Sequence, residues 1–287
     1  MAASLIAYPF GPAGRELPRV GQGSWQIPER GAAAEEAKLA LRRGIELGMV
    51  HVDTAEMYGD GRAEELIGEA IQGLPRVELF IVSKVLPSNA SYQGTLRACE
   101  RSLKRLRTDY LDAYLLHWRG SQPLADTMRA LEKLVDDGKI RSLGVSNFDV
   151  EDLEEAEEAL ERHPIACNQV LYHPWERGIE HRVVPWCEKQ SVAIVAYTPF
   201  GRRSLPDAAT PQGKLLSELA AKYAASVHAV ILAFLTRRNG TFAIPKAASI
   251  AHVEANAKAN QFRLDDAEIA QLEKAFPRPR SAELRMI

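Results

Sequence analysis

The apolar positions of the chain form short hydrophobic runs separated by amphipathic helical stretches. Several runs are apolar at consecutive positions, which is typical of strands buried on both faces of a parallel sheet. An eighth, weaker run at 20–25 is interrupted by Gly21 and Gly23. The seven clear runs are 49–52, 79–82, 111–116, 140–145, 166–171, 192–197 and 242–244. The pattern therefore predicts eight strands.

Helical periodicity lies between these runs. In 32–47, Ala37, Leu41 and Ile45 form one apolar stripe, and Gly48 follows where a C-terminal glycine cap belongs. Similar stripes predict helices over 96–106 and 124–135. Strands that alternate with helices predict a parallel sheet.

The number of units favours a closed barrel. Eight strand–helix units in 287 residues fit a single-domain (β/α)₈ TIM barrel spanning 1–287. Two open sheets of the dinucleotide-binding type are the alternative. They should carry Gly-x-Gly-x-x-Gly after a strand, and 21–23 supplies only its first two glycines. The predicted fold class is therefore α/β, with a TIM barrel as its architecture.

The composition of the chain indicates which kinds of binding partner and which cellular compartment to expect. Lys and Arg number 36 against 38 Asp and Glu, a net charge of −2. This balance predicts neither a nucleic-acid partner nor a membrane surface. No apolar run approaches the ~20 residues of a membrane span, and the N-terminus lacks a signal-peptide pattern. Three cysteines at wide spacing fit a reducing compartment, so we expect a cytoplasmic protein.

Polar residues follow the predicted strands at their carboxyl ends, where the active site of a barrel enzyme lies. Singly, Asp53 could cap a turn and His117 could be a structural histidine. Lys84 is harder to explain in that way, because a lone ammonium after an apolar run is costly to bury. The set is Asp53, Lys84, His117, Ser146, Asn147, Gln169, Tyr197 and Lys246.

An aspartate, a tyrosine, a lysine and a histidine near one another could together form a proton-donor assembly. Tyrosine has a pKa of about 10, and a nearby ammonium lowers it. Tyr58 lies five residues after Asp53, on the same predicted loop. We therefore predict that Tyr58 protonates a carbonyl oxygen, with Lys84 tuning Tyr58 and Asp53 anchoring Lys84. His117 would position the carbonyl.

A proton donor performs half of a reduction, and hydride must come from a cofactor. Ser146, Asn147 and Gln169 suit a carboxamide, and Tyr197 offers an aromatic face. Lys246 precedes a predicted helix that Ser249 would cap, which suits a phosphate. His252 and Asn256, four residues apart, would share the helix face of Ser249. We expect Arg202 and Arg203, after Gly201, on the loop beside the cofactor pyrophosphate, although they could equally be an exposed basic pair.

Other chemistries find less support. The chain has no His-Glu-x-x-His, no Cys-x-x-Cys, no phosphate-binding P-loop and no Gly-x-Ser-x-Gly elbow. We therefore predict no metal site. A barrel hydrolase or a divalent-metal barrel that uses Asp53, His117 and His173 stays open as an alternative, although their spacing does not favour it.

A family resemblance rests on several ordered motifs. Residues 48–59 read GMVHVDTAEMYG, 80–84 read FIVSK and 115–118 read LLHW. Further along are GVSNF at 144–148, NQ at 168–169, AYTPFG at 196–201 and IPK at 244–246. Over nearly its full length the chain resembles the aldo-keto reductase family.

The resemblance implies a fold and an activity. It implies a (β/α)₈ barrel whose bottom is covered by a short N-terminal hairpin, and a monomer. The implied reaction is NADPH-dependent reduction of aldehydes or ketones to alcohols, with alcohol oxidation as its reverse. The implied partner is a small carbonyl or alcohol substrate. Similar proteins also include regulatory subunits, so a nicotinamide-redox-sensing binding module with slow turnover is the alternative function.

The resemblance also assigns site residues. It implies a catalytic tetrad of Asp53, Tyr58, Lys84 and His117, and a substrate pocket formed by Trp25, Tyr58, His117 and Trp118. The implied cofactor-binding residues are Gly23, Ser24, Trp25, Asp53, Ser146, Asn147, Gln169, Tyr197, Thr198, Pro199, Phe200, Gly201, Ile244, Pro245, Lys246, Ala247, Ser249, His252 and Asn256.

The chain departs from the family pattern near the predicted phosphate site. His252 stands where similar proteins that prefer NADPH often have an arginine, and Ala255 stands where many have a glutamate. A histidine carries less charge at neutral pH. We therefore expect NADP(H) as cofactor, with NADH as a weaker substitute. The tail after Pro277 is short, which predicts an open substrate pocket.

Overall fold

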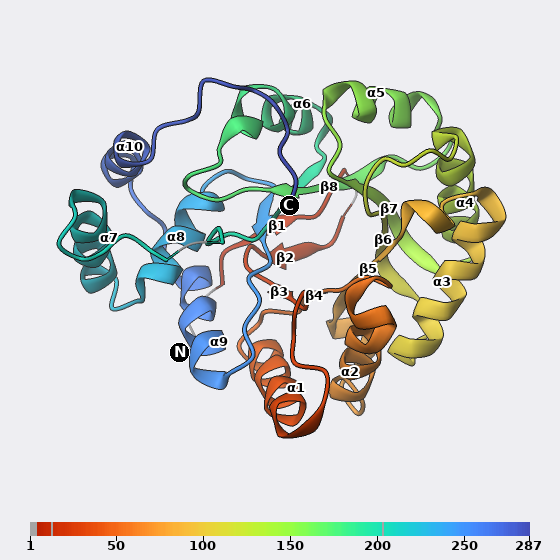
Figure 1. Ribbon diagram of the computed structural model, residues 1–287, viewed down its shortest axis with the longest axis horizontal. Coiled ribbons are helices and arrows are strands. Elements are labelled where there is room, and N and C mark those ends of the chain that lie inside the picture. Colours follow the sequence, from red (N-terminus) through yellow and green to blue (C-terminus); the bar gives the residue numbers. More distant parts are fainter. Residues whose placement is uncertain (1–4, 13, 203) are drawn as a thin grey trace.

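A parallel barrel forms the centre of the computed structural model, which describes residues 5–12, 14–202 and 204–287 (Figure 1). Each strand of its eight-stranded sheet pairs in parallel with the next along the chain. The strands are β3 (Gln22–Gly23), β4 (His51–Asp53), β5 (Phe80–Val85), β6 (Leu111–Leu116), β7 (Ile140–Ser146), β8 (Ile165–Leu171), β9 (Ala193–Tyr197) and β10 (Thr241–Ala243).

The barrel closes between its first and last strands. The backbone N–H of Gly21 donates to the carbonyl of Ala243 at 2.9 Å, and that of Ala243 donates to the carbonyl of Arg19 at 2.9 Å. A Cβ on Gly21 would lie 2.5 Å from the carbonyl oxygen of His51. The glycine that weakened the strand prediction at 20–25 is therefore required for close approach. The regular strand there is only Gln22–Gly23.

Helices surround the barrel (Figure 1). They are α1 (Gly31–Glu46), α2 (Arg62–Ala70), α3 (Tyr92–Leu106), α4 (Leu124–Asp136), α5 (Val150–Glu158), α6 (Val183–Gln190), α7 (Pro211–Lys222), α8 (Val227–Leu235), α9 (Ile250–Ala257) and α10 (Asp266–Ala275). Short 3₁₀ turns are η1 (Tyr58–Gly61), η2 (Arg76–Glu78), η3 (Pro87–Asn89), η4 (Gly178–His181) and η5 (Lys258–Gln261). The predicted (β/α)₈ architecture is confirmed, and Gly48 after α1 has the expected positive φ of 88°.

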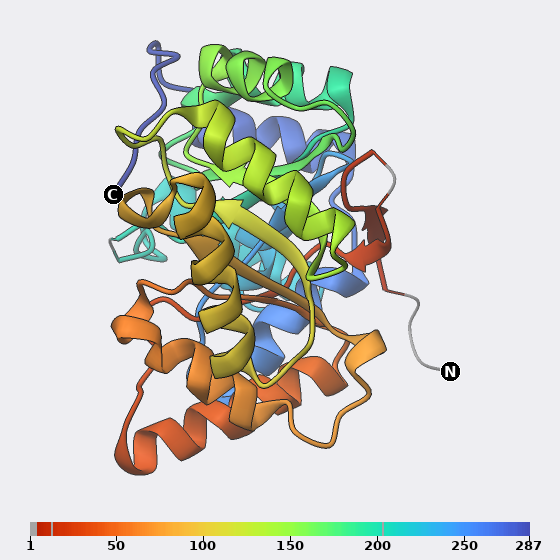
Figure 2. The ribbon, with the colours of Figure 1, turned by 90° about the vertical axis from the view of Figure 1, so that its right-hand side faces the viewer.

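A hairpin covers the bottom of the barrel, as predicted. Its strands are β1 (Ala7–Pro9) and β2 (Glu16–Pro18), paired antiparallel. Tyr8, Phe10 and Leu17 are buried against Phe80 and Phe242, which lie near the amino ends of β5 and β10. Figure 2 shows this hairpin and the C-terminus on opposite sides of the molecule. The hairpin closes one end of the barrel, so only the other end can open into a site.

Apolar side chains fill the lower part of the barrel interior, among them Val82, Leu115 and Val195. A second, larger cluster lies between the sheet and the helices. Within the described ranges, no single helix is long and apolar enough to span a membrane. The pair α7 and α8, bent by 94°, passes that test of length and composition when taken together.

Candidate active site

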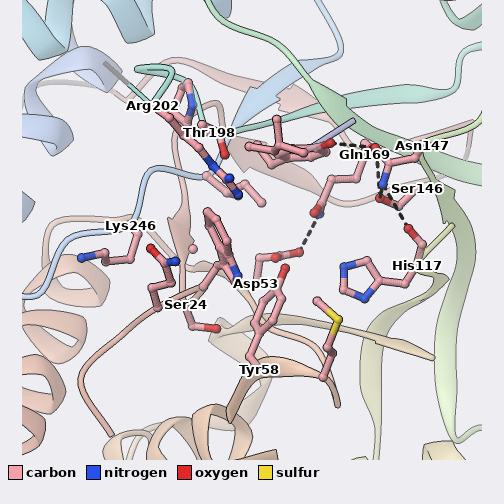
Figure 3. A pocket seen from close by; sticks show the side chains of 18 of the residues that line it. Ser24, Asp53, Tyr58, His117, Ser146, Asn147, Gln169, Thr198, Arg202 and Lys246 are labelled. Carbon is pink, nitrogen blue, oxygen red and sulfur yellow. Dashed lines mark hydrogen bonds between the residues drawn. The ribbon is translucent and has the colours of Figure 1, made fainter. Parts of the chain in front are cut away.

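The carboxyl ends of the strands surround one cavity of about 330 Å³. Parallel strands bring these ends to the same rim, so residues far apart in sequence meet there. Figure 3 shows the side chains converging on the cavity. The predicted residues that line it are Gly23, Ser24, Trp25, Asp53, Tyr58, His117, Trp118, Ser146, Asn147, Gln169, Tyr197, Thr198, Pro199, Phe200, Gly201, Ile244 and Lys246.

A buried ion pair lies at the base of the site. Lys84 is fully buried, and its Nζ donates to Asp53 Oδ1 at 2.6 Å and to the carbonyl of Thr54 at 2.7 Å. Gln169 Nε2 donates to the other Asp53 oxygen at 2.7 Å. Burial opposes the charged form of Lys84, but Asp53 and Tyr58 outweigh it and hold the pKa of Lys84 above its usual value. Lys84 is therefore a fixed ammonium.

The Tyr58 hydroxyl lies beside this ammonium. Lys84 Nζ is 3.4 Å from the Tyr58 oxygen. Burial raises the pKa of Tyr58, the Lys84 charge lowers it, and the Asp53 charge raises it; the net direction is upward. The predicted lowering by Lys84 is present, but in this ligand-free state burial outweighs it. Tyr58 is consequently a protonated phenol at neutral pH, which is the form a proton donor requires.

His117 faces Tyr58 across the cavity floor. The two rings are 5.7 Å apart and nearly perpendicular. Burial, followed by the charge of Lys84, lowers the pKa of His117 to about 2, so the imidazole is neutral. Its Nδ1 is buried and has no hydrogen-bond partner among the described residues. A neutral imidazole beside a phenol can donate a hydrogen bond to a carbonyl oxygen without protonating it.

A network of amides and hydroxyls forms the adjacent wall. The carbonyl of Gln169 accepts from Ser146 Oγ at 2.9 Å and from the backbone N–H of Asn147 at 2.8 Å. Asn147 Nδ2 donates to Ser146 Oγ and to the His117 carbonyl, both at 3.1 Å. Tyr197 donates its hydroxyl proton to Asn147 Oδ1 at 2.8 Å. These bonds fix the side chains that were predicted to hold a carboxamide.

Four cavity residues were not assigned there by sequence reasoning: Gln26, Met57, Arg202 and Ile287. The Arg202 guanidinium carbon lies 4.6 Å from the Trp25 ring centroid, across the rim. Arg202 was expected only beside the cofactor phosphates or as an exposed residue, and Arg203 lies outside the described residues. Nothing in the sequence indicates Gln26, whereas the position of Met57 beside Tyr58 could have indicated it.

The short C-terminal tail also reaches the rim. His181 Nε2 contacts the carbonyl of Pro279 at 2.8 Å, and Arg285 pairs with Glu176 at 3.4 Å. Ile287 then lines the cavity. The expected openness on this side is therefore reduced, because the tail lies against the loop that follows β8. Such a long-range contact has no local sequence pattern.

Some predicted cofactor residues lie outside the cavity lining. These residues lie on the segment that runs from the end of β10 into α9. There, Ser249 Oγ accepts a hydrogen bond from the backbone N–H of His252 at 3.4 Å and caps the helix, as predicted. Asn256 is buried, whereas Lys246 and His252 are exposed. The residues in question are Pro245, Ala247, Ser249, His252 and Asn256.

On the side of the cavity between Ser24 and Lys246, several polar groups lack a hydrogen-bond or ion-pair partner among the described residues. The buried Ser24 hydroxyl has no hydrogen-bond partner among the described residues. Neither Lys246 nor Arg202 forms an ion pair with any residue that the structure describes. Cations without ion-pair partners suit an anionic ligand, and Lys246 shortly precedes the N-terminus of α9. No group of three or more His, Cys, Asp or Glu in the described ranges could hold a metal ion.

Comparison with known proteins gives a family for this arrangement. The profile of the Aldo/keto reductase family matches residues 19–276. The methylglyoxal reductase YeaE of Escherichia coli K12 is 46% identical over 264 residues, which cover 92% of this chain and 93% of that protein. The glyoxal reductase of Bacillus subtilis is 37% identical over 262 residues, covering 91% and 89%.

Solved structures agree with the curated relatives. An aldo-keto reductase from Klebsiella pneumoniae in complex with NADPH superposes with a TM-score of 0.88 at 43% identity, covering 100% of both chains. A Klebsiella pneumoniae structure in complex with NADP and acetate gives a TM-score of 0.88 at 44% identity, covering 98% of this chain and 99% of the other.

Proposed function

The chain belongs to the aldo/keto reductase family, and we propose that its cavity binds NADPH and reduces small aldehydes and ketones to alcohols. One observation carries this proposal most directly. The buried Lys84–Asp53 pair holds a protonated Tyr58 hydroxyl at 3.4 Å, with a neutral His117 ring beside it. That combination is a proton donor next to a hydrogen-bond donor, at the base of an open cavity.

The residues present fit a nicotinamide dinucleotide phosphate. The Ser146–Asn147–Gln169 network offers amide groups for a carboxamide, and Tyr197 offers a ring face. The unpaired Lys246 offers a charge for phosphate, and the α9 N-terminus adds backbone N–H groups with a partial positive charge. Ser24, Arg202, His252 and Asn256 would complete the binding surface. The relatives crystallised with NADPH or NADP support this cofactor.

The reaction needs a hydride and a proton, and NADPH supplies the hydride when bound. Tyr58 gives its phenolic proton to the carbonyl oxygen, so the substrate gains one hydride and one proton and becomes an alcohol. His117 donates a hydrogen bond to the same oxygen and orients it. Lys84 stabilises the phenolate left on Tyr58, and Asp53 keeps Lys84 in place. In alcohol oxidation Tyr58 accepts the proton instead.

The lining of the cavity favours small substrates. Trp25, Met57, Trp118 and Ile287 bring apolar surface close to Tyr58. The relatives named methylglyoxal reductase and glyoxal reductase support α-oxoaldehydes as the substrate class. We therefore propose small aldehydes with a second carbonyl group as preferred substrates.

Three further statements belong to the proposal. The whole chain, 1–287, forms one domain, since a single barrel takes in every described strand except the hairpin beneath it. It acts as a monomer, because every proposed site residue comes from one copy. It acts in the cytoplasm, where the buried free cysteines Cys99, Cys167 and Cys187 stay reduced.

The test is NADPH oxidation, followed by absorbance, with methylglyoxal, glyoxal and a simple ketone, and with NADH in parallel. We expect turnover with NADPH and a preference for the α-oxoaldehydes. Lys246→Met should weaken NADPH binding about tenfold, the equivalent of one charge-assisted contact, and leave NADH binding nearly unchanged. Tight NADPH binding without turnover on any carbonyl would instead favour the redox-sensing module. Failure to bind NADPH would overturn the proposal.

A further inference from the structure

A buried glutamate that does not line the cavity lies close to the proton donor in sequence. Glu56 is 8% exposed and stands two residues before Tyr58, on the loop between β4 and η1. A buried carboxylate is costly unless several donors satisfy it. The donors of Glu56 therefore indicate what the loop is attached to.

Among the described residues, the three donors to the Glu56 side chain belong to the part of the chain that follows Lys84, from Leu86 to Arg101. Oε1 accepts from the backbone N–H of Leu86 at 2.8 Å and from Asn89 Nδ2 at 2.9 Å. Oε2 accepts from an Arg101 Nη at 3.2 Å. The backbone N–H of Glu56 also donates to the carbonyl of Lys84 itself, at 3.3 Å. One residue thus joins the Tyr58 loop to the end of β5.

The other contacts of Tyr58 are less directional. Its backbone N–H donates to the carbonyl of Ala55 at 3.1 Å, a bond within the same loop. Its side chain packs against an apolar cluster that includes Ile27 and Ala63. Neither contact joins the loop to β5. Thr54, at the start of the loop, does so, because its N–H donates to the Val82 carbonyl at 2.9 Å and its carbonyl accepts from Lys84 Nζ at 2.7 Å. Glu56 adds a second attachment closer to Tyr58, through its N–H to the Lys84 carbonyl and through its side chain to Leu86 and Asn89 just beyond β5.

We propose that Glu56 is a positioning residue, which holds the Tyr58 hydroxyl within reach of the Lys84 ammonium. This inference rests on the proposed function, in which Tyr58 transfers the proton. Displacement of the loop by a fraction of an ångström would weaken the influence of Lys84 on Tyr58. The Tyr58 phenolate would then be less stable and proton transfer slower, while cofactor binding on the opposite wall would be unchanged.

The principal variant is Glu56→Gln, which keeps the volume but removes the charge and turns one acceptor into a donor. We expect kcat to fall about ten- to hundredfold, the range typical of a small misplacement of a catalytic group. The Kd for NADPH, measured by fluorescence titration, should not change. The alkaline limb of alcohol oxidation, which reports formation of the Tyr58 phenolate, should move to higher pH.

A titration without turnover provides an independent readout. The ultraviolet phenolate signal of the protein, minus that of its Tyr58→Phe variant, isolates Tyr58 from the other seven tyrosines. The same difference in the Glu56→Gln background should titrate at higher pH. If the wild-type protein shows no carbonyl reduction, the proposed function fails, yet this titration still decides the role of Glu56.

A matched control exists in another buried glutamate that holds a loop. Glu132 accepts backbone N–H groups of Glu161, Arg162 and His163 at 3.1, 2.6 and 3.1 Å, and it does not line the cavity. Glu132→Gln should lower the thermal midpoint as Glu56→Gln does. It should leave kcat and the Tyr58 titration at wild-type values, because its loop carries no site residue.

Asn89→Asp is a second variant that tests the same role if the Glu56→Gln protein does not fold. Asn89 is half-buried, and an isosteric carboxylate there repels Glu56 from a contact that is now 2.9 Å. We expect the same fall in kcat and the same upward titration shift. Wild-type kcat and titration in either variant, with only a lowered thermal midpoint, would show that Glu56 is merely structural and would overturn the inference.

Discussion

Two buried histidines lie at opposite ends of the barrel, and in several properties they are alike. Both occur at or just after a strand, and burial followed by the Lys84 charge lowers both pKa values, to about 3 for His51 and to about 2 for His117. Both have buried ring nitrogens without a hydrogen-bond partner among the described residues. Burial and a shifted pKa therefore do not distinguish a reactive histidine from a structural one.

The surroundings distinguish them. His51 lies near the bottom, where the rings of Phe10, Phe80 and Phe242 surround it at centroid distances of 5.5, 5.4 and 6.4 Å. His117 lies at the top, where it lines a cavity and faces the Tyr58 hydroxyl. Access to a cavity beside a second polar group is what suits His117 to the role proposed for it. The lower end uses the same residue type for packing alone.

The largest expected effect tests the reactive end. Tyr58→Phe removes only the hydroxyl, so the proton donor is lost while the ring packing remains. We expect kcat to fall about 10³-fold or more, within the range of general acid catalysis, with NADPH affinity unchanged. Steady-state assays with methylglyoxal and a fluorescence titration measure the two quantities. An equal loss of NADPH affinity would contradict the role of Tyr58 as proton donor.

The next prediction tests the packed end. Leu17 of β2 is fully buried beneath the barrel. Leu17→Ala should lower the free energy of unfolding by about 3 kcal/mol, a typical cost for a cavity in a core, without changing kcat at 25 °C. Urea unfolding and a standard assay measure this. A large fall in kcat in the folded variant would show that the two ends are not independent.

A pH experiment then separates the two histidines. His51 is neutral in the folded protein down to a pKa of about 3, whereas an unfolded histidine binds a proton below about 6.5. Stability from the neutral His51 is thus complete above pH 6.5 and is lost as the pH falls toward 3. At pH 5 the linked loss is about 2 kcal/mol.

His51→Leu removes that linkage without touching the cavity. The difference in unfolding free energy between pH 7 and pH 5 should therefore shrink by about 2 kcal/mol, while kcat at pH 7 stays the same. Urea unfolding at the two pH values measures the difference. If the variant keeps the wild-type pH dependence, His51 is not the group that titrates.

The sequence predicts the residues at the strand ends better than those in the loops and the tail. Runs of consecutive apolar residues mark the parallel strands, and the polar residues directly after those runs, such as Asp53 and His117, then fall on one rim. Contacts made by loops and by the tail leave no periodic signal. Glu56 contacts residues 30 to 45 positions away, and Ile287 reaches the cavity only through the course of the terminal segment, so only the folded chain reveals them.

The net pKa of Tyr58 could not be predicted either. The sequence indicates that Lys84 lies near and lowers it, and the structure confirms that direction. The extent of burial depends on how the loop and the neighbouring helices α1 and α2 enclose the ring. Burial by segments that are distant in sequence outweighs the effect of Lys84, so the pKa of Tyr58 is raised in the ligand-free protein.

The smallest expected effect concerns the tail at the reactive end. Ile287 lines both the main cavity and a neighbouring cavity of about 370 Å³ that also contacts His173 and Glu176. Removal of Met286 and Ile287 should join the two spaces. The ratio of kcat/KM for a bulky aromatic aldehyde to that for methylglyoxal should then rise about three- to tenfold, because a few apolar contacts are worth about 1 kcal/mol.

A substitution that removes one charge from the ion pair of the tail serves as the control for this truncation. Glu176→Gln weakens the pair with Arg285 that holds the tail, at 3.4 Å, but leaves Ile287 in the chain. Because the Arg285 partner is exposed, we expect the pair to contribute only about 0 to 1 kcal/mol. The effect of Glu176→Gln on the ratio should therefore be smaller than that of the truncation and in the same direction. Equal kcat/KM ratios in the wild type and the truncated protein would mean that the tail does not limit substrate size. The selectivity of the upper end would then come from the other apolar lining residues, Trp25, Met57 and Trp118.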